Sequence, residues 1–531
     1  MVDIVDIHGK SLRAQASAFS AADPVSRELG TWQPSALSGD AAILPGKSRM
    51  DSRTKDLVRN NGIASSGINL HLDSIVGAQF KLIAKPNWLA LGIDPESDYA
   101  NDWVKHTEAL WTSYAEDAID CPMDAEGKRT FTQLIRSGMY HHVIHGEDLG
   151  TAEWKERAGH QFNTCFKIIS PDRLCNPEGK RNSDKLRGGV ELGRNNEAEA
   201  YFIRTSHQSD GRLGVQNNKW RRIAKKKSWG RYQVIHIFDP MEDGQTRGHS
   251  GFSSVLKRLK MLDKFQEVVL QNAIVNAMYA MVIESELDTT TALEAIGASG
   301  EDSNLAGYLG AIQEYHQGAN VTFDGVKIPH LFPGEKLNMQ TAKSPMGVEQ
   351  YEQGLLRYVA SGLNVSYEQL SRDYSKTNYS SARASMMETQ RHFAGKRQFI
   401  AKRKAGHLYA LWLEEAFSKG LVELPKGAPT FWQAKSAWCR SDWIGAGQSH
   451  IDGLKEAKRL VLLIEAGLMT EEKAHAELGQ DYQDVFTQLM REKKEREDKG
   501  LPPPLWMQTA KMSTSVAYQE VPEVNTNSQT A

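Results

Sequence analysis

The sequence predicts a mixed α+β fold that is mainly helical, with long helices joined to one β-rich module. Residues 253–284 contain no Pro or Gly, and an apolar residue recurs there every three or four positions, which predicts a helix about 45 Å long. Residues 161–238 contain short apolar runs separated by Gly, Asn and Asp, which is typical of strands. Helical patterns return at 347–362 and 381–419.

The long helix predicted at 253–284 changes character along its length. Its expected buried face consists of Val255, Leu259, Leu262, Phe265, Val269 and Ala273. Its second half is apolar almost all round, but Gln271, Asn272 and Asn276 interrupt it. Because a membrane span needs about 20 consistently apolar residues, we favour packing among other helices and expect no membrane partner.

Composition excludes several classes of protein. The formal net charge of −2 argues against a generally basic coat for nucleic acid, so any such contact would be local. The four cysteines show no CxxC pair and no zinc-finger spacing, which suits a reducing compartment. Acidic residues replace the positive start of a signal peptide, so we expect a soluble protein made in the cytoplasm.

Residues 1–50 lack periodicity and are expected to form an extended or partly disordered arm. Gly46, Lys47 and Ser48 end a relaxed phosphate-loop pattern. We reject nucleotide binding there, because no strand precedes the loop and Pro45 removes one N–H donor.

The search for catalytic and metal motifs gives little. His141, His142 and His145 lie close together with Glu147 beyond them, but HExxH is absent, and we favour a surface or interface cluster over a metal site. No nucleophile elbow or paired-carboxylate signature is present. The expectation is a protein that is not an enzyme and has no cofactor and no metal.

The remaining segments predict alternating helices and strands. We expect helices within 51–76 and at 102–116, 130–145 and 451–499, and strands at 79–84 and 148–154. Residues 429–444 are expected to be strand-like and to pack on the β module. Between the long helices, a short helix is expected at 305–316 and a hairpin turning at Asp324–Gly325. The tail beyond 504 is expected to be disordered.

A basic patch is predicted within Lys219–Arg231, where two tryptophans and no acid accompany the basic residues. Its members are Lys219, Arg221, Arg222, Lys225, Lys226 and Lys227. Basic residues interleaved with aromatics suit contact with a phosphate backbone. The alternative, to which we give more weight, is a solvated hairpin whose charges spread apart in three dimensions.

A polar loop follows the helix at 347–362. Residues 365–383 contain three tyrosines together with Arg372, Lys376 and Arg383, and show no apolar periodicity. A loop of this composition between two helices is suited to presenting polar and aromatic side chains to a partner. A plain connection between helices is the equal alternative.

Several stretches resemble those of lambda-type tailed-phage portal proteins, and the similarity runs from about Ala41 to Pro504. They are KDLVRNNGIA (55–64), KRTFTQLIR (128–136), EDGQTRG (242–248), KMLDKFQ (260–266), AIVNAMYAMVIESELDT (273–289), LLRYVASGLNVSYEQLSRDYS (355–375), YSSARAS (379–385) and DWIGAGQSHIDGLKEAK (442–458). The N-terminal arm and the C-terminal tail lie outside this similarity, and the basic patch matches it only loosely.

The resemblance implies an elongated portal subunit of a virion, a head–tail connector in which about twelve copies form a ring at one capsid vertex. Double-stranded DNA would pass through the ring during genome packaging and ejection. The implied partners are terminase, head-completion, capsid and scaffold proteins, with assembly in the host cytoplasm. The alternative is a nucleic-acid-processing enzyme, which would need carboxylates binding Mg²⁺, or another ring-shaped nucleic-acid-binding protein.

The resemblance also implies a division of the chain. The expected parts are an N-terminal arm (1–50), an α/β wing with the β-rich module (51–245), a stem helix (246–284), an α/β clip insertion (285–340), a second stem helix (341–364), a tunnel loop (365–381), a long helix (382–420), a wing return strand (421–444), a helical crown (445–500) and a disordered tail (501–531). The residues expected to face DNA are Arg372, Tyr374, Lys376, Tyr379 and Arg383.

Overall fold

The computed structural model describes residues 31–214, 219–279, 314, 321–323, 326–328, 347–425, 427–447 and 453–503. Within these, the fold is mixed α and β with small sheets, as the sequence predicts. The chain divides into two compact units, each built from three stretches of sequence. Unit 1 comprises 1–68, 140–152 and 168–367, and unit 2 comprises 69–139, 153–167 and 368–531.

Unit 1 contains most of the strands. Its elements are α1 (Gly39–Ile43), α2 (Lys47–Asn60), the first half of α3 (Gly62–Ile75), the end of α5 (Phe131–His145), most of β2 (Glu147–Trp154), the end of β3 (Thr164–Ile169), η3 (Pro171–Arg173), β4 (Leu186–Arg187), β5 (Val190–Leu192), β6 (Ala198–Arg204), η4 (Gln208–Leu213), β7 (Trp220–Ala224), β8 (Val234–Phe238), α6 (Leu256–Tyr279), β9 (Val321–Phe323), β10 (Val326–Ile328) and α9 (Val348–Gly362).

The β-rich module is two small sheets around one apolar core. A four-stranded antiparallel sheet has the order β4-β5-β6-β7, and a three-stranded sheet has the order β3-β2-β8. Alternate strand residues point inward, and Leu149, Ile169, Val190, Tyr201 and Val234 are among the buried side chains. Strands β3, β5, β6 and β8 confirm the short strands predicted within residues 161–238.

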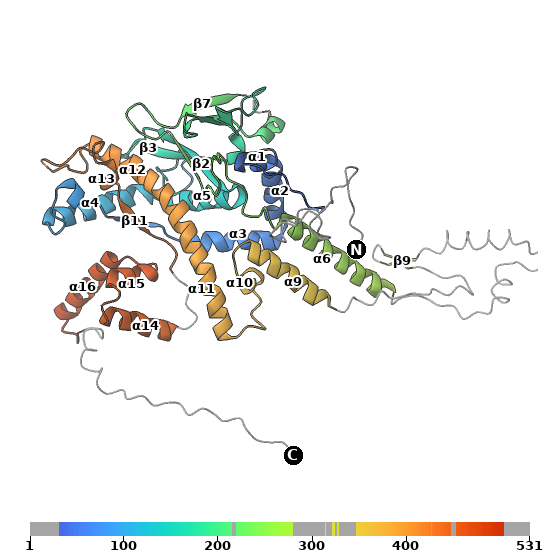
Figure 1. Cartoon of the computed structure of the whole chain (residues 1–531). Coiled ribbons are helices and arrows are strands. Elements are labelled where there is room, and N and C mark those ends of the chain that lie inside the picture. Colours follow the sequence, from blue (N-terminus) through green and yellow to red (C-terminus); the bar gives the residue numbers. More distant parts are fainter. Residues whose placement is uncertain are drawn as a thin grey trace, which may run out of the picture. The chain divides into compact units, whose positions relative to one another are not determined.

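The long predicted helix is confirmed as α6, although it begins at Leu256 rather than at 253. Leu259 and Leu262 are fully buried, Phe265 and Val269 are half-buried, and Ala273 is exposed. Helix α9 lies beside α6 (Figure 1), and the rings of Phe265 and Tyr351 are 5.4 Å apart. Residues 280–284 and the helix expected at 305–316 lie outside the described residues, apart from Glu314. The hairpin expected at Asp324–Gly325 is confirmed by the pairing of β9 with β10.

Unit 2 is mainly helical. Its elements are the second half of α3, β1 (Lys81–Ala84), η2 (Leu89–Leu91), α4 (Asp98–Ala115), most of α5, the start of β3, most of α10 (Tyr367–Ser371), α11 (Tyr379–Lys396), the π-helical turn η5 (Arg397–Ala401), α12 (Lys402–Ser418), α13 (Lys435–Trp438), β11 (Ser441–Ile444), α14 (Gly453–Glu465), α15 (Glu471–Glu477) and α16 (Tyr482–Asp498).

Helices α11 and α12 continue one another through η5, so the long helix predicted at 381–419 is confirmed despite Gly395 and Gly406 (Figure 1). At the π turn, Arg397 donates hydrogen bonds to the carbonyls of Ser74, Ile75 and Ala446. Helix α12 is buried over most of its length within an aromatic core. Among the aromatic residues of that core are Trp111, Tyr409, Trp412, Phe131 and Trp443.

Two predictions about local structure are wrong. Residues 39–50, expected to be extended or disordered, form α1 and the start of α2, with Asp40 and Lys47 buried. The strand expected at 429–444 is reduced to β11, because Lys435–Trp438 is helical. Strand β11 pairs with β1 instead of joining the β module, and its Trp443 stacks on Phe80. A run of aromatics satisfies the periodicity of either element, so tertiary packing decided between them.

No helix among the described residues is long and apolar enough to cross a membrane.

Candidate nucleic-acid interface

The polar loop predicted at 365–381 contains the short helix α10 and a seven-residue turn, 372–378, that leads into α11. Two side chains hold this turn. Asp373 Oδ1 accepts hydrogen bonds from Ser375 N at 3.0 Å and Ser375 Oγ at 2.6 Å. Asn378 caps α11 by accepting from Ser381 N at 2.8 Å. The turn is therefore built from local side-chain hydrogen bonds.

The predicted DNA-facing residues are presented by this turn and the start of α11. Arg372, Tyr374, Lys376 and Arg383 are exposed, with about half of the Tyr374 surface accessible. Arg372 has φ +59°, a left-handed conformation that costs a non-glycine residue about 1 kcal/mol. Tyr379 is the first residue of α11. The turn thus carries two cations and an aromatic side chain. It leads directly into α11, which continues through η5 into the buried α12.

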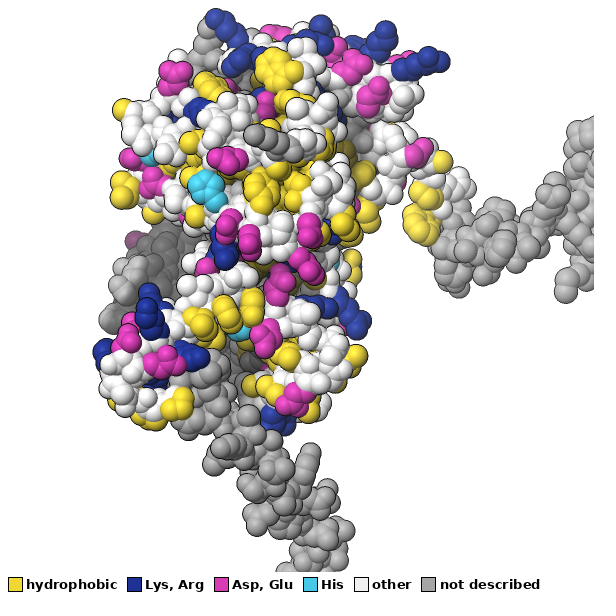
Figure 2. Space-filling view, turned by 90° about the vertical axis from the view of Figure 1, so that its left-hand side faces the viewer, with side chains coloured by type: hydrophobic (Ala, Val, Ile, Leu, Met, Phe, Trp, Pro, Cys, Tyr) yellow, Lys and Arg dark blue, Asp and Glu magenta, His cyan; other side chains and the backbone are white. Residues whose placement is uncertain are grey.

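The predicted basic patch begins at Lys219, immediately before β7, which is one of the two edge strands of its sheet within the described residues. Figure 2 shows Lys and Arg side chains interspersed with Asp and Glu at the top of the molecule, where Figure 1 places β7. Arg222 is neutralised by Glu191, with Nε–Oε2 at 2.7 Å and Nη2–Oε1 at 2.9 Å. Lys226 lies over the ring of Tyr232 at 4.6 Å. The positive charge of Arg222 is therefore neutralised by an ion pair on the surface.

The other members of the patch divide between the strand and the turn after it. Lys219, Arg221 and Lys227 are exposed, and Lys225 is half-buried. Side chains alternate along a strand, so Arg221 and Arg222 leave β7 on opposite faces. Ile223 shares a face with Arg221 and packs on the apolar core. The structure does not gather the six cations on one surface of the strand.

The histidine cluster expected at the surface or at an interface is instead buried, which corrects that prediction. His142, His145 and Glu147 are inaccessible or nearly so, and His141 is half-buried. Glu147 begins β2 and receives Arg247, whose Nε lies 2.9 Å from both carboxylate oxygens. Lys47 Nζ lies 3.1 Å from Glu147 Oε1, and His236 Nε2 lies 3.0 Å from Oε2.

Arg247 satisfies its remaining donors with backbone carbonyls. Nη1 donates to Leu174 O at 2.7 Å and Gly188 O at 2.6 Å, and Nη2 donates to Pro171 O at 3.0 Å. Burial alone would raise the pKa of Glu147, but Arg247 and Lys47 outweigh it and hold the pKa well below its ordinary value. The guanidinium therefore joins the segment before α6 to β2, β4 and η3. The sequence contained one signal for the importance of Arg247, since this residue lies in EDGQTRG, a stretch that carries the family resemblance.

Lys47, the lysine of the phosphate-loop pattern, also binds backbone carbonyls and a carboxylate. Its ammonium donates to His145 O at 2.8 Å and Gly248 O at 2.9 Å, and it pairs with Asp51. It is buried, with its donors directed into the protein. The residue that matched a nucleotide motif thus anchors α2 in unit 1.

Asp51, His145 and Asp172 have an arrangement that metal ligands also adopt. His145 Nδ1 lies 2.9 Å from Asp51 Oδ2 and 3.7 Å from Asp172 Oδ1. However, Lys47 Nζ is 3.1 Å from Asp51 Oδ2, and Lys55 donates to Asp172. Burial alone would raise the pKa of Asp172, but His145 and Lys55 lower it to about 2. Because ammonium groups already occupy these carboxylates, we interpret the cluster as an ion-pair network.

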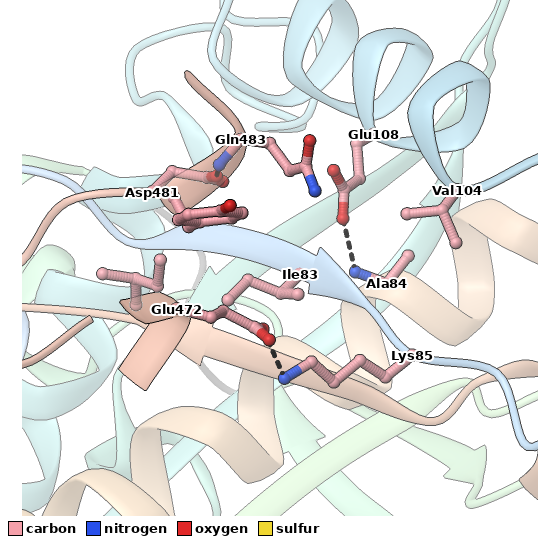
Figure 3. A pocket seen from close by; sticks show the side chains of 10 residues that line it. Ile83, Ala84, Lys85, Val104, Glu108, Glu472, Asp481 and Gln483 are labelled. Atoms are coloured by element: carbon pink, nitrogen blue, oxygen red, sulfur yellow. Dashed lines mark hydrogen bonds and ion pairs between the residues drawn. The ribbon is translucent and has the colours of Figure 1, made fainter. Parts of the chain in front are cut away.

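A pocket of about 240 Å³ lies in unit 2 between α4, β1 and the start of α16 (Figure 3). Glu108 Oε1 accepts a hydrogen bond from Ala84 N at 2.7 Å, and Lys85 pairs with Glu472 at 2.8 Å. The pocket is smaller than most small-molecule sites and is lined by several charged groups, so we assign it no ligand.

The burial of Glu108 in this pocket predicts a pH dependence of the free energy of unfolding. Burial raises the pKa of Glu108 to about 7, so folding favours its protonated form. Its contribution to stability is complete below about pH 4.5 and is lost as the pH rises through about 7. Glu108→Gln should match the parent near pH 4 and exceed it by up to about 3 kcal/mol at pH 8. Denaturant unfolding at both pH values tests this.

Glu96→Gln is the control for Glu108→Gln, because Glu96 is exposed. Its substitution should leave the pH dependence of unfolding unchanged. Equal pH profiles for Glu108→Gln and the parent chain would contradict the prediction.

Comparison with known proteins identifies the family. A family model described as "Phage portal protein, lambda family" matches residues 25–397. The chain is 45% identical over 505 residues to portal protein B of Escherichia phage lambda, covering 94% of this chain and 93% of the relative. It is equally similar to the portal protein of Escherichia phage N15, with 94% of each chain covered.

Solved structures give weaker matches. A chain from the neck of a native gene transfer agent particle, computed with C12 symmetry, aligns with a TM-score of 0.39 and 11% identity, covering 82% of this chain and 99% of that one. The sequence matches define the class: this is a phage portal protein, a structural component of the phage head rather than an enzyme. More narrowly, the chain belongs to the lambda family of these proteins.

Proposed function

We propose that about twelve copies of this chain form a ring at one capsid vertex of a virion and that double-stranded DNA passes through it during packaging and ejection. Family membership supports the role in the virion. The observation that supports the DNA role is the exposed turn at 372–378, which bears Arg372, Tyr374 and Lys376. This turn leads into α11, which continues into the buried α12. Because this helix is anchored by the buried α12, it can hold the turn in place while DNA moves past it.

The charge of the chain supports a sliding contact. Each phosphate that a protein neutralises adds affinity and salt dependence, so a strongly basic channel would retard DNA. This chain has a formal charge of −2, and its turn offers few cations. We include Tyr379 and Arg383 in the DNA-facing set, because both lie in the first turns of α11. The basic patch at 219–227 is a second candidate contact, weakened by the Arg222–Glu191 pair.

The regions implied by the family form part of the same proposal. Residues 51–245 with 421–444 would be the wing, α6 and α9 the stem, 285–340 the clip, and α14–α16 the crown. The clip would bind terminase during packaging and head-completion proteins afterwards, while capsid and scaffold proteins would contact the assembled ring. Assembly would take place in the host cytoplasm.

Negative-stain microscopy of the purified full chain tests the ring. Rings with a central hole are expected. Compact monomers or filaments at concentrations that support head assembly would contradict the proposal.

The tunnel-loop assignment has its own test. Arg372→Ala combined with Lys376→Ala should leave rings intact but reduce DNA packaging or retention, measured as nuclease-protected genomes per particle. Arg212→Ala combined with Arg194→Ala is the matched control, since both residues are exposed cations elsewhere. Loss of rings in the loop variant would make the loop structural, and normal packaging would remove it from the DNA contact.

A further inference from the structure

The C-terminal helices α14–α16 expose much of their apolar surface. Of the hydrophobic residues described in 453–503, Leu460 and Ala474 are buried. On α14 and the turn after it, Leu454 is 68% exposed, Val461 52%, Leu462 63% and Leu468 74%. On α16, Phe486 and Met490 are each nearly half exposed. In the lower part of Figure 2, where Figure 1 labels α14–α16, hydrophobic side chains lie on the surface among charged ones.

The exposed residues of α14 form a stripe that faces away from α15. Leu454, Val461 and Leu462 are seven and eight residues apart, which places them on one side of a helix. Leu460 is buried and Arg459 pairs with Glu477 of α15, which defines the inner side. At 100° per residue, Leu454 and Val461 project roughly opposite Arg459. We define Leu454, Val461, Leu462 and Leu468 as the α14 stripe.

Helix α16 has an apolar stripe on the side away from β1. Its N-terminal acids Asp481 and Asp484 pair with Lys81 of β1. Phe486 and Met490 are one turn apart, and Phe486 stacks on Tyr482 at 5.7 Å. Counted around the helix, Phe486 lies opposite Asp484. Tyr482 lines the pocket beside Ile83 and Ala84 of β1, so we define only Phe486 and Met490 as the α16 stripe.

We propose that the α14 stripe of one copy packs against the α16 stripe of the next copy, which would make these helices a subunit–subunit contact of the ring. The inference rests on the proposed ring. Symmetry and exposed apolar area both point to a second copy as the occupant.

A closed ring of more than two identical subunits is built from contacts between two different patches, whereas a patch that meets itself ends at a dimer. This chain offers one apolar stripe on α14 and a different one on α16.

Eight large apolar side chains of 453–503 are about half exposed or more, namely Leu454, Val461, Leu462, Leu468, Leu478, Phe486, Met490 and Leu501. At roughly 100 Å² each they offer on the order of 800 Å² in all. Because one copy contributes its α14 stripe and the next copy its α16 stripe, this sum is the upper limit for one contact, about half of a standard interface. A monomer rarely leaves so much apolar surface uncovered.

Thiol cross-linking of the full chain tests the pairing. A double variant with Val461→Cys and Met490→Cys, treated with a short flexible bis-maleimide, should give a ladder of covalent oligomers on a denaturing gel. A mixture of chains carrying only Val461→Cys with chains carrying only Met490→Cys should stop at dimers. Each single variant alone should stay monomeric, as should the parent chain with its four native cysteines.

The alternatives give other patterns. Dimers from Val461→Cys alone would mean that the α14 stripe meets itself. Rings visible by microscopy without any ladder would overturn the pairing but leave the proposed function standing. Absence of rings from the parent chain would instead contradict the proposed function.

A charge substitution gives an independent check. Val461→Asp should shift the population from rings to monomers in analytical ultracentrifugation, with a loss of at least tenfold in the ring fraction. Leu213→Asp is the matched control, because Leu213 is 80% exposed and lies outside both stripes. An intact ring for Val461→Asp would overturn the proposal.

Discussion

Arg247→Ala is expected to destabilise the chain by about 3–5 kcal/mol, because it leaves the buried carboxylate of Glu147 without its main cation. Three backbone carbonyls, those of Pro171, Leu174 and Gly188, would lose their donors as well. The expected result is a sharp fall in soluble yield and in the thermal unfolding midpoint.

Arg222→Ala is the matched control for Arg247→Ala. Arg222 also pairs with a glutamate through two nitrogens, but it is exposed, and surface ion pairs contribute under about 1 kcal/mol. The difference between the variants measures the effect of burial on the same chemistry. If both lost the same stability, the buried network would not hold unit 1 together.

The same network predicts a response to acid. The pKa of Glu147 is depressed in the folded chain, so its contribution to stability is present above its ordinary pKa of 4.5 and is lost as the pH falls through the folded value. The ion-paired Asp172, with a pKa of about 2, acts in the same direction. Destabilisation below about pH 4 should therefore be smaller in Arg247→Ala than in the parent chain.

Gly146→Ala is expected to cost about 2–5 kcal/mol, because two effects combine at this position. Gly146 has φ +77°, which L side chains adopt at a cost. An added Cβ would also lie 2.0 Å from the backbone oxygen of His249, and backbone has no rotamer with which to move aside. The unfolding midpoint and the soluble yield measure the loss.

Gly179→Ala separates the two effects. Gly179 has the same φ of +77°, but nothing lies within 4 Å of an added Cβ. Its substitution should cost about 1–2 kcal/mol from backbone conformation alone. Equal losses at the two glycines would mean that the turn between α5 and β2 relaxes to admit a methyl group.

The sequence by itself determined the elements with strong periodicity and the family. Apolar spacing predicted α6, α9 and the helix spanning α11 to α12, because a 3.6-residue repeat is a local property. Alternating runs with turn residues predicted β3, β5, β6 and β8 for the same reason. Short stretches spread over most of the chain carry the resemblance to the portal family.

Only the tertiary structure decided which charged residues are buried and with whom. Glu147 lies one hundred residues after Lys47 and one hundred before Arg247, and no local pattern records that the three meet. Their sequence context led to predictions of an extended or partly disordered arm, which is wrong for residues 39–50, and of a surface or interface histidine cluster, which is buried. A buried charge is tolerated only where several partners converge, and that convergence is a property of the folded chain. The aromatic run at 429–444 shows the same limit, since the partner of Trp443 lies more than three hundred residues earlier, on the segment that precedes β1.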